Sequence, residues 1–169
     1  MIRIATMADV PVLHALVESA FRGDAARAGW THEADLLDGQ RTDRAALADV
    51  FADPDRTILM TTDATGCVQV SRVAPGLSAL GLLAVRPDVQ AGGLGRRLVA
   101  GAERHAVREY DAGRIEMTVI AARRELIAWY ERQGYRRTGE TRPFPMDDPR
   151  FGLPRQPLSF VVLDRELDR

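Results

Sequence analysis

The sequence predicts a single mixed α/β domain, in which a central β-sheet of about seven strands is flanked by about four helices. The chain has 169 residues, of which 46% are hydrophobic and 28% charged, as in an ordinary globular domain with a sizeable core. Apolar residues recur with a period of two in some segments and about 3.6 in others. These segments follow one another in the order β-α-α-β-β-β-α-β-α-β-β, without an internal repeat or a linker, which is typical of a mixed α/β fold.

The N-terminal part begins with a short strand, Ile2–Ala5. Thr6–Asp9 then resembles a capping box, and a helix with apolar residues at helical spacing follows it to about Phe21. Residues 22–42 are irregular and mixed in character. Asp43 is a suitable N-cap for a second, short helix.

The later strands are recognised by runs of apolar and β-branched residues between turn sequences. They are Thr57–Thr62, Cys67–Val73, Ala79–Val85, Arg114–Ile120, Tyr135–Thr141 and Leu158–Leu163. The strand Ala79–Val85 is apolar almost throughout, which predicts a central strand buried on both faces. In Arg114–Ile120, alternation places Glu116 and Thr118 on the face opposite Met117.

Two longer helices lie between the later strands. Leu94, Leu98, Ala102, Ala106 and Tyr110 repeat at i, i+4 and predict the first of them. The second is the segment ARRELIAWYERQG, Ala122 to Gly134, where Gly134 favours a C-cap.

Composition excludes several classes of protein. The net charge is -1, so no basic field attracts nucleic acid or an anionic membrane. No apolar run is long enough for a membrane span, and the single cysteine, Cys67, forms no internal disulfide, so a cytoplasmic protein is the default expectation. All 23 basic residues are arginine, which removes any lysine-based mechanism, and we expect no metal.

The stretch VQAGGLGRRL, Val89 to Leu98, is the clearest functional signal. Glycines that open a helix let backbone N–H groups converge on a phosphate. A Walker A loop is excluded because the chain has no lysine, and a dinucleotide fingerprint fits poorly because its third glycine position is Leu98. The pattern Q/R-x-x-G-x-G/A fits; its residues are Gln90, Ala91, Gly92, Gly93, Leu94 and Gly95.

A second motif supports this interpretation. The helix Glu125–Tyr135 contains Tyr130-Glu131 followed by Gly134-Tyr135. Together the two motifs resemble the acetyl-CoA signature and the Y-E-x-x-G-F/Y segment of the GNAT superfamily of N-acetyltransferases. The resemblance implies one N-acetyltransferase domain over residues 1–169, with an acetyl-CoA-binding core at about 79–135.

The resemblance also implies roles for individual residues. Tyr130 is expected to act as the general acid that protonates the leaving thiolate, and the backbone of Leu82–Val85 is expected to pair with the pantetheine arm. The residues expected to hold acetyl-CoA are Leu83, Ala84, Val85, Gln90, Ala91, Gly92, Gly93, Leu94, Gly95, Arg96, Arg97 and Arg123. For Arg123, a role at the substrate or on the surface stays open.

The general base is less well defined. Many family members carry an acid or a histidine on the strand that matches Ala79–Val85, and this chain has none there. The glutamate of other members aligns with Thr118, so Glu116, two residues earlier on the same face, is the best candidate, acting through water. A base role for His32 is a weaker alternative.

The acceptor pocket is expected to form around residues 29–42 and the loop Glu140–Pro145, a pairing that resembles a bacterial subgroup of the family. Candidate substrate-binding residues are Trp30, His32, Glu33, Asp38 and Phe144, and carboxylates there would suit a cationic amine. We expect acetyl transfer from acetyl-CoA to a small primary amine by direct attack in a ternary complex. Acetylation of a protein N-terminus and a non-catalytic acyl-CoA-binding module stay as alternatives, and dimers common in the family leave a homodimer open.

Overall fold

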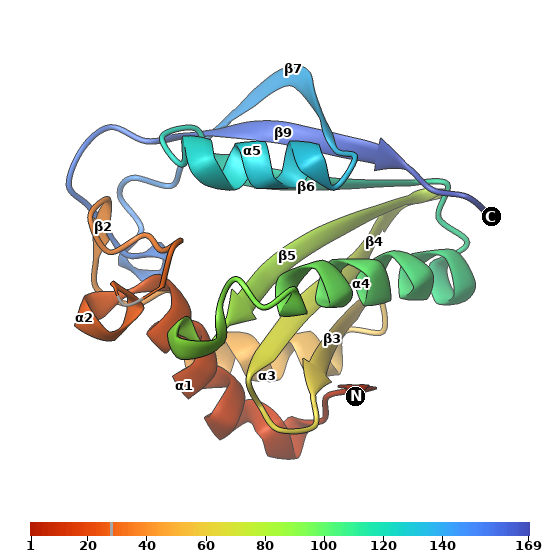
Figure 1. Ribbon diagram of the computed structural model, residues 1–169, viewed down its shortest axis with the longest axis horizontal. Helices are drawn as coiled ribbons and strands as arrows, with labels where there is room; N and C mark the ends of the chain where they lie inside the picture. Colours follow the sequence, from red (N-terminus) through yellow and green to blue (C-terminus); the bar gives the residue numbers. More distant parts are fainter. Residues whose placement is uncertain (28) are drawn as a thin grey trace.

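The computed structural model describes residues 1–27 and 29–169 and contains the predicted seven-stranded mixed sheet (Figure 1). The strand order is β1-β3-β4-β5-β6-β9-β7, so the apolar strand β5 lies at its centre, as predicted. The strands are β1 (Ile2–Ile4), β3 (Arg56–Thr61), β4 (Gly66–Ala74), β5 (Leu77–Val85), β6 (Arg114–Ile120), β7 (Arg136–Pro143) and β9 (Ser159–Glu166). A separate ribbon pairs β2 (Leu37–Asp38) with β8 (Leu153–Pro154).

The helices cover both faces of the sheet, with α1 and α3 on one side and α4 and α5 on the other (Figure 1). They are α1 (Val10–Phe21), α2 (Gly23–Ala26), α3 (Arg44–Ala52), α4 (Leu94–Tyr110) and α5 (Arg124–Arg132), with 3-10 turns at Met7–Asp9, Pro87–Val89 and Pro149–Phe151. The predicted fold class is therefore confirmed. The sequence did not predict α2 or the β2–β8 ribbon within the irregular segments.

Alternation along the strands builds two cores. In β3, Ile58 and Met60 point toward α1 and α3, whereas Leu59 points toward α4. The core beneath α4 and α5 contains Leu98 and Ile127, both almost fully buried. Because a strand alternates sides at every residue, one apolar run can supply both cores.

Local signals that the sequence predicted are present at the helix ends. The Thr6 backbone N–H donates to Asp9 Oδ2 at 2.8 Å, as in a capping box. The Asp43 carboxylate accepts from the Ala46 N–H at 2.7 Å and caps α3. Gly134 follows α5 with a φ of 99°, which a residue with a Cβ rarely adopts.

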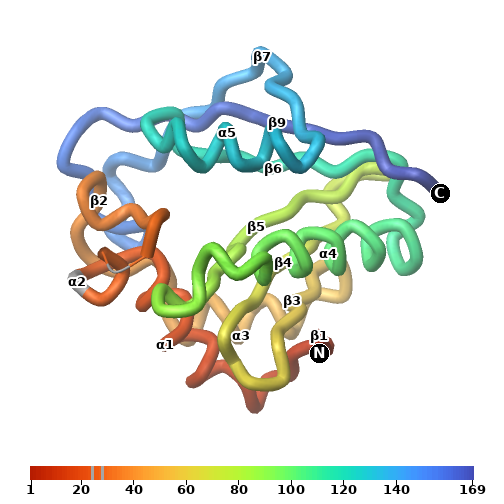
Figure 2. The backbone as a smooth tube through the Cα atoms, in the orientation of Figure 1, coloured from red at the N-terminus to blue at the C-terminus, as the bar shows by residue number. Residues whose placement is uncertain are grey.

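The sheet divides between β5 and β6. These parallel strands pair only at their beginnings, from Leu77 opposite Arg114 to Ala79 opposite Glu116. Beyond Ala79 they diverge, and the opening between them is visible in the backbone tube (Figure 2). The backbone groups along this opening have no cross-strand partner among the described residues, so they are available to a ligand.

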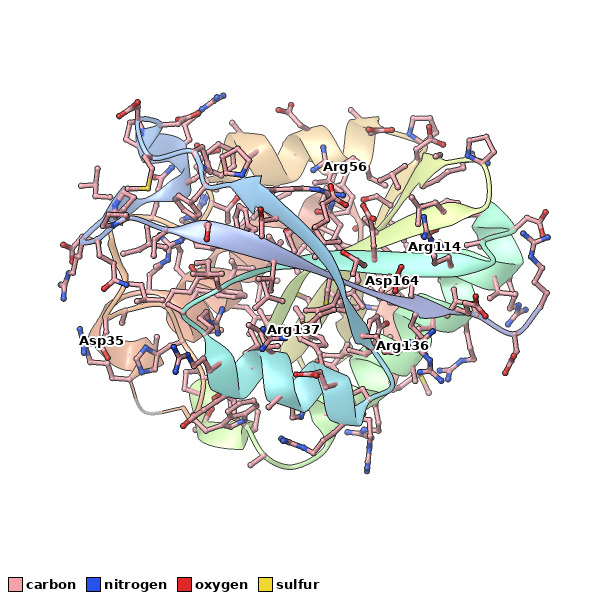
Figure 3. The ribbon with its side chains drawn as sticks, turned by 90° about the horizontal axis from the view of Figure 1, so that it is seen from above. Asp35, Arg56, Arg114, Arg136, Arg137 and Asp164 are labelled. Atoms are coloured by element: carbon pink, nitrogen blue, oxygen red, sulfur yellow. The ribbon has the colours of Figure 1, made fainter. Side chains whose placement is uncertain are left out.

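The last strand in the order, β7, is an exposed edge that carries many charges. Arg136 and Arg137 stand on this edge, and Arg114 of β6 lies beside Asp164 of β9, which it contacts at 3.4 Å (Figure 3). Charged residues on an edge strand oppose pairing with another chain. This edge therefore disfavours extension of the sheet by a second chain.

Candidate active site

One cavity of about 540 Å³ occupies the opening between β5 and β6. Its walls come from β5, β6, the turn before α4, α5 and the end of α1. This volume lies within the range of small-molecule sites. The cavity passes from the α4 face of the sheet, where the glycine turn lies, to the α1 face, where Phe21 and Arg41 lie.

The glycine turn forms one end of the cavity. Gly93 is the N-cap of α4 with a φ of 82°, and Ala91 also has a positive φ of 68°. No side chain caps α4, so the first N–H groups of the helix lack an intrahelical partner and face an anion-binding position. Gly92, Leu94, Gly95 and Arg96 also line the cavity, whereas Arg97 is exposed and lies outside its lining.

Gln90 holds the turn in place through its side chain. Its Nε2 donates to the Val85 carbonyl at 3.1 Å, and its Oε1 accepts from the Thr31 N–H at 3.4 Å. The residue thus links the end of β5 to the loop after α2. Its amide is already engaged on both sides, so Gln90 orients the turn through these two contacts.

A bulge in β5 shapes the middle of the cavity. Gly81 opposes Gln69 and Ala84 opposes Cys67, so β5 has one extra residue there, and Leu82 has a φ of 51°. A Cβ added at Gly81 would meet nothing within 4 Å, because this position faces the opening. Leu83 and Val85 line the cavity with Gly81 and Leu82.

Ala84 differs from its neighbours, because its side chain is buried in the core on the α1 face. Ala84 does not line the cavity, unlike Leu83 and Val85, which the sequence grouped with it.

Tyr130 lies in the wall of the cavity. It is 5% exposed and stacks edge-to-face on Trp129 and Tyr135, with ring centroids 4.9 and 5.8 Å away. Burial raises the pKa of Tyr130 above its ordinary value, and the positive charge of Arg123 opposes this shift. Its hydroxyl hydrogen-bonds to none of the described residues. The phenol is therefore protonated at neutral pH.

Glu116 is not brought to the cavity. Its carboxylate pairs with Arg142, with Oε1 3.3 Å from Nη2, and it does not line the opening. Thr118, its neighbour on the same face, does line the opening. The strands diverge only beyond Glu116, so the residue lies where the sheet is still closed. Cys67 is fully buried on β4, and burial raises the pKa of its thiol to about 12, which removes it as a nucleophile.

Two of the predicted residues, Glu33 and Arg123, form one network at the other end of the cavity, and a third, Trp30, lines the same end. Glu33 is 6% exposed and accepts from Arg22 Nη2 at 2.7 Å and from Arg123 Nη1 at 3.2 Å. Arg123 also donates to Thr31 Oγ1 at 2.6 Å. Trp30 lies beside Trp129, with ring centroids 6.4 Å apart, and lines the same cavity.

The remaining predicted residues lie outside the cavity lining. His32 Nδ1 accepts from the Ala34 N–H at 3.1 Å, and Asp38 pairs with Arg155 on the surface. Phe144 is buried against Phe160, which itself reaches the cavity. The structure thus brings together Trp30, Glu33 and Arg123 but not His32, Asp38 or Phe144.

The segments that carry these residues meet in the β2–β8 ribbon. Arg22 Nη2 donates to the Phe151 carbonyl at 3.1 Å, and the Arg155 N–H donates to the Leu36 carbonyl at 2.9 Å. Leu37 packs with Phe144 in a small core of its own. Residues 29–42 supply the lining of this end of the cavity, and residues 142–157, which are distant in the sequence, pack against them from outside the lining.

Sequence reasoning missed Phe21, Arg41 and Trp129, which all line the cavity. Phe21 carried only a helical apolar signal, and Trp129 follows the same pattern in α5. Arg41 lay in a segment without periodicity, so no pattern selected it. An arginine beside an acid-rich loop is a weak signal, because most such residues form surface ion pairs.

The fold and this site define an acetyltransferase of the GNAT class. Residues 31–144 match the family described as "Acetyltransferase (GNAT) domain", so the chain belongs to the GNAT family and is an N-acetyltransferase. A search of curated protein sequences found no significant match.

Solved structures share the fold over nearly the whole chain. The ribosomal-protein-alanine N-acetyltransferase from Brucella melitensis is 20% identical, with a TM-score of 0.70, and the match covers 99% of each chain. Spermidine N-acetyltransferase from Vibrio cholerae is 13% identical, with a TM-score of 0.67, over 98% of this chain and 94% of that one. The yncA protein of Salmonella typhimurium, solved with its cofactor acetyl-CoA, is 17% identical, with a TM-score of 0.68, over 100% and 94%. At these identities the likeness establishes the fold alone.

No helix formed by the described residues is both long and apolar enough to cross a membrane. Within residues 1–27 and 29–169, no group of three or more His, Cys, Asp or Glu side chains is arranged to hold a metal ion.

Proposed function

We propose that this protein transfers an acetyl group from acetyl-CoA to a small primary amine, by direct attack of the amine within a ternary complex. One observation carries the proposal: a single cavity connects the glycine turn before α4 to Tyr130 and then to the network around Glu33. Donor and acceptor can thus enter from opposite faces of the sheet and meet in the opening between β5 and β6.

The glycine turn fits the pyrophosphate of CoA. The uncapped N-terminus of α4 offers several N–H groups and a partial positive charge of roughly half a unit, and Arg96 adds a full positive charge nearby. Gly93 has a φ of 82°, which an L-residue with a side chain rarely adopts, so a substitution there would strain the turn. The unpaired backbone of the opening suits an extended amide-containing chain, such as the pantetheine arm.

The chemistry assigns distinct tasks to the residues of the cavity. Acetyl-CoA supplies the acetyl group as a thioester. As the amine forms its C–N bond and the C–S bond breaks, Tyr130 donates its proton to the departing sulfur; the amine gives up one proton to solvent, and solvent returns one to Tyr130. Among the described residues, Glu33 is the one carboxylate that lines the cavity, and two arginines already engage it. The amine is therefore expected to react from its neutral form.

The enclosed acceptor end favours a small molecule over a protein N-terminus. Trp30, Thr31 and the Arg22–Glu33–Arg123 network stand across this end of the cavity. A polypeptide acceptor would need an open groove at that position. No unpaired carboxylate lines the cavity among the described residues, so the amine is expected to lose its proton to solvent.

Calorimetric titration with acetyl-CoA, using NADH and ATP as controls, tests the donor site. Gly81→Val places a branched side chain in the opening at a position without positive φ, and is expected to weaken acetyl-CoA binding about tenfold or more. Ala79→Val is the matched control on the same strand, outside the cavity lining. Equal affinity of the two variants, or a preference for a nucleotide, would contradict the donor site.

Turnover is measured as CoA released in the presence of a panel of amines. Release that depends on an added amine supports the transferase. Tight acetyl-CoA binding without release across the panel would favour the non-catalytic module instead.

A further inference from the structure

We infer that the acceptor is an amine that also carries a carboxylate, as a free amino acid does, and that Arg41 binds this carboxylate. This substrate class rests on the proposed function and concerns the same cavity. At its acceptor end, the positive charges of arginine side chains outnumber the carboxylates that pair with them.

Three guanidinium groups gather there, on Arg22, Arg41 and Arg123. Glu33 engages two of them, with Oε2 bound to Arg22 and Oε1 bound to Arg123. Both oxygens of this carboxylate are therefore committed. The charge of Arg41 receives no such partner.

Arg41 is half-buried and lines the cavity. Among the described residues, its guanidinium makes neither a hydrogen bond nor an ion pair, although its own backbone N–H donates to Glu18 Oε1 at 2.8 Å. The same oxygen accepts from the Thr42 N–H at 2.8 Å. Glu18 therefore fixes the backbone of this segment and leaves the head of the Arg41 side chain to the cavity.

An aromatic ring orients this guanidinium. Its central carbon lies 5.2 Å from the centroid of Phe21, which also lines the cavity. Stacking on a ring leaves the in-plane N–H donors of an arginine free. A planar fork with free donors matches the two oxygens of a carboxylate.

The position of Arg41 excludes a role in holding the CoA phosphates. Phe21 ends α1, on one face of the sheet, and the glycine turn begins α4, on the other face. The cavity passes between them through the divided sheet. Arg41 thus belongs to the side on which the acceptor enters, whereas Arg123, which also lines the cavity, lies close enough to Tyr130 for its charge to lower the pKa of that phenol.

This arrangement disfavours polycationic acceptors. Three carboxylates of residues 29–42 that could attract them are paired with arginines: Glu33 inside the cavity, and Asp35 and Asp38 on the surface. A desolvated cation without a partner repels a second positive charge and attracts a negative one. The neutral amine of an amino acid, held through its carboxylate, satisfies both conditions.

The test compares free amino acids with their carboxamides as acceptors. For the wild type, we expect kcat/KM to be about 10- to 100-fold higher for the acid, which is the range of a hydrogen-bonded charge pair. Arg41→Gln should bring this ratio close to one while leaving acetyl-CoA affinity unchanged. Arg155→Gln, which removes a surface arginine paired with Asp38, is the control and should keep the wild-type ratio.

Binding of the amino acid without acetyl-CoA, measured by calorimetry, is the second readout. Binding of the acid but not the amide, lost in Arg41→Gln, supports the inference even if acetyl-CoA fails to bind and the proposed function falls. Equal use of acid and amide by the wild type, or a ratio unchanged in Arg41→Gln, would overturn it. A preference for spermidine, or no amino acid that binds or reacts, would overturn it too.

Discussion

Removal of the Tyr130 hydroxyl separates a catalytic role from a packing role. Tyr130→Phe keeps the aromatic ring between Trp129 and Tyr135 and deletes only one oxygen. That oxygen hydrogen-bonds to none of the described residues, so its loss should change the free energy of unfolding by less than about 0.5 kcal/mol. If it donates the proton to the leaving sulfur, kcat should fall about 100-fold, the lower end of what general acid catalysis contributes.

Tyr135→Phe makes the same chemical change 5.8 Å away and is the matched control. The Tyr135 hydroxyl donates to Glu103 Oε1 at 2.7 Å, and the side chain is 2% exposed. A buried hydrogen bond to a carboxylate contributes roughly 1.5–3 kcal/mol, so this variant should lose stability by about that amount. Tyr135 does not line the cavity, so kcat should stay near the wild-type value.

Two assays read these outcomes. Release of CoA at saturating acetyl-CoA gives kcat, and urea unfolding with an unchanged m-value gives stability. Acetyl-CoA affinity should be the same in both variants, because the hydroxyl of Tyr130 acts only in the transition state. If Tyr130→Phe kept its kcat, or weakened acetyl-CoA binding with no effect on kcat, the assignment of the acid would be wrong.

The remaining predictions concern burial. Cys67 is fully buried, and its thiol has a pKa of about 12. It should therefore react with an aromatic disulfide reagent no faster than the protein unfolds, and react completely in denaturant. Rapid labelling of the native protein would contradict the buried position. Glu33→Gln should lower the free energy of unfolding by about 3 kcal/mol, because it leaves Arg22 and Arg123 buried without a carboxylate. Asp35→Asn, in an exposed pair with Arg27, should cost less than about 1 kcal/mol by the same urea measurement, and equal losses would argue against the network.

The parts of the fold that the sequence predicted are those decided locally. Alternation along Arg114–Ile120 is set by strand geometry alone, and the structure bears it out. The cap at Asp43 and the glycine at 134 act within four residues of their own helix ends. Such signals need no knowledge of the tertiary arrangement.

Of the residues that form the candidate site, the sequence predicted those that a local pattern marks. The glycine turn could be recognised because its backbone conformation demands those residues. Glu116 was selected by counting along a strand, but its access depends on where β5 and β6 part, which no count reveals. Arg41 and the partners of Glu33 depend on contacts between segments far apart in the chain, such as Arg22 with Phe151.

The β2–β8 ribbon has a consequence for how this enzyme can diversify. The parts that would hold the acetyl donor belong to the main sheet and α4, whereas residues 29–42 and 142–157 form an annex joined by the β2–β8 ribbon. Leu37 and Phe144 of the annex pack on Ile120 of β6, so the annex meets the sheet through this one small core. Substitutions in the annex can therefore change which amine is accepted while the residues that would hold the donor stay the same. To transfer acceptor specificity between relatives, both annex segments should be exchanged together rather than either alone.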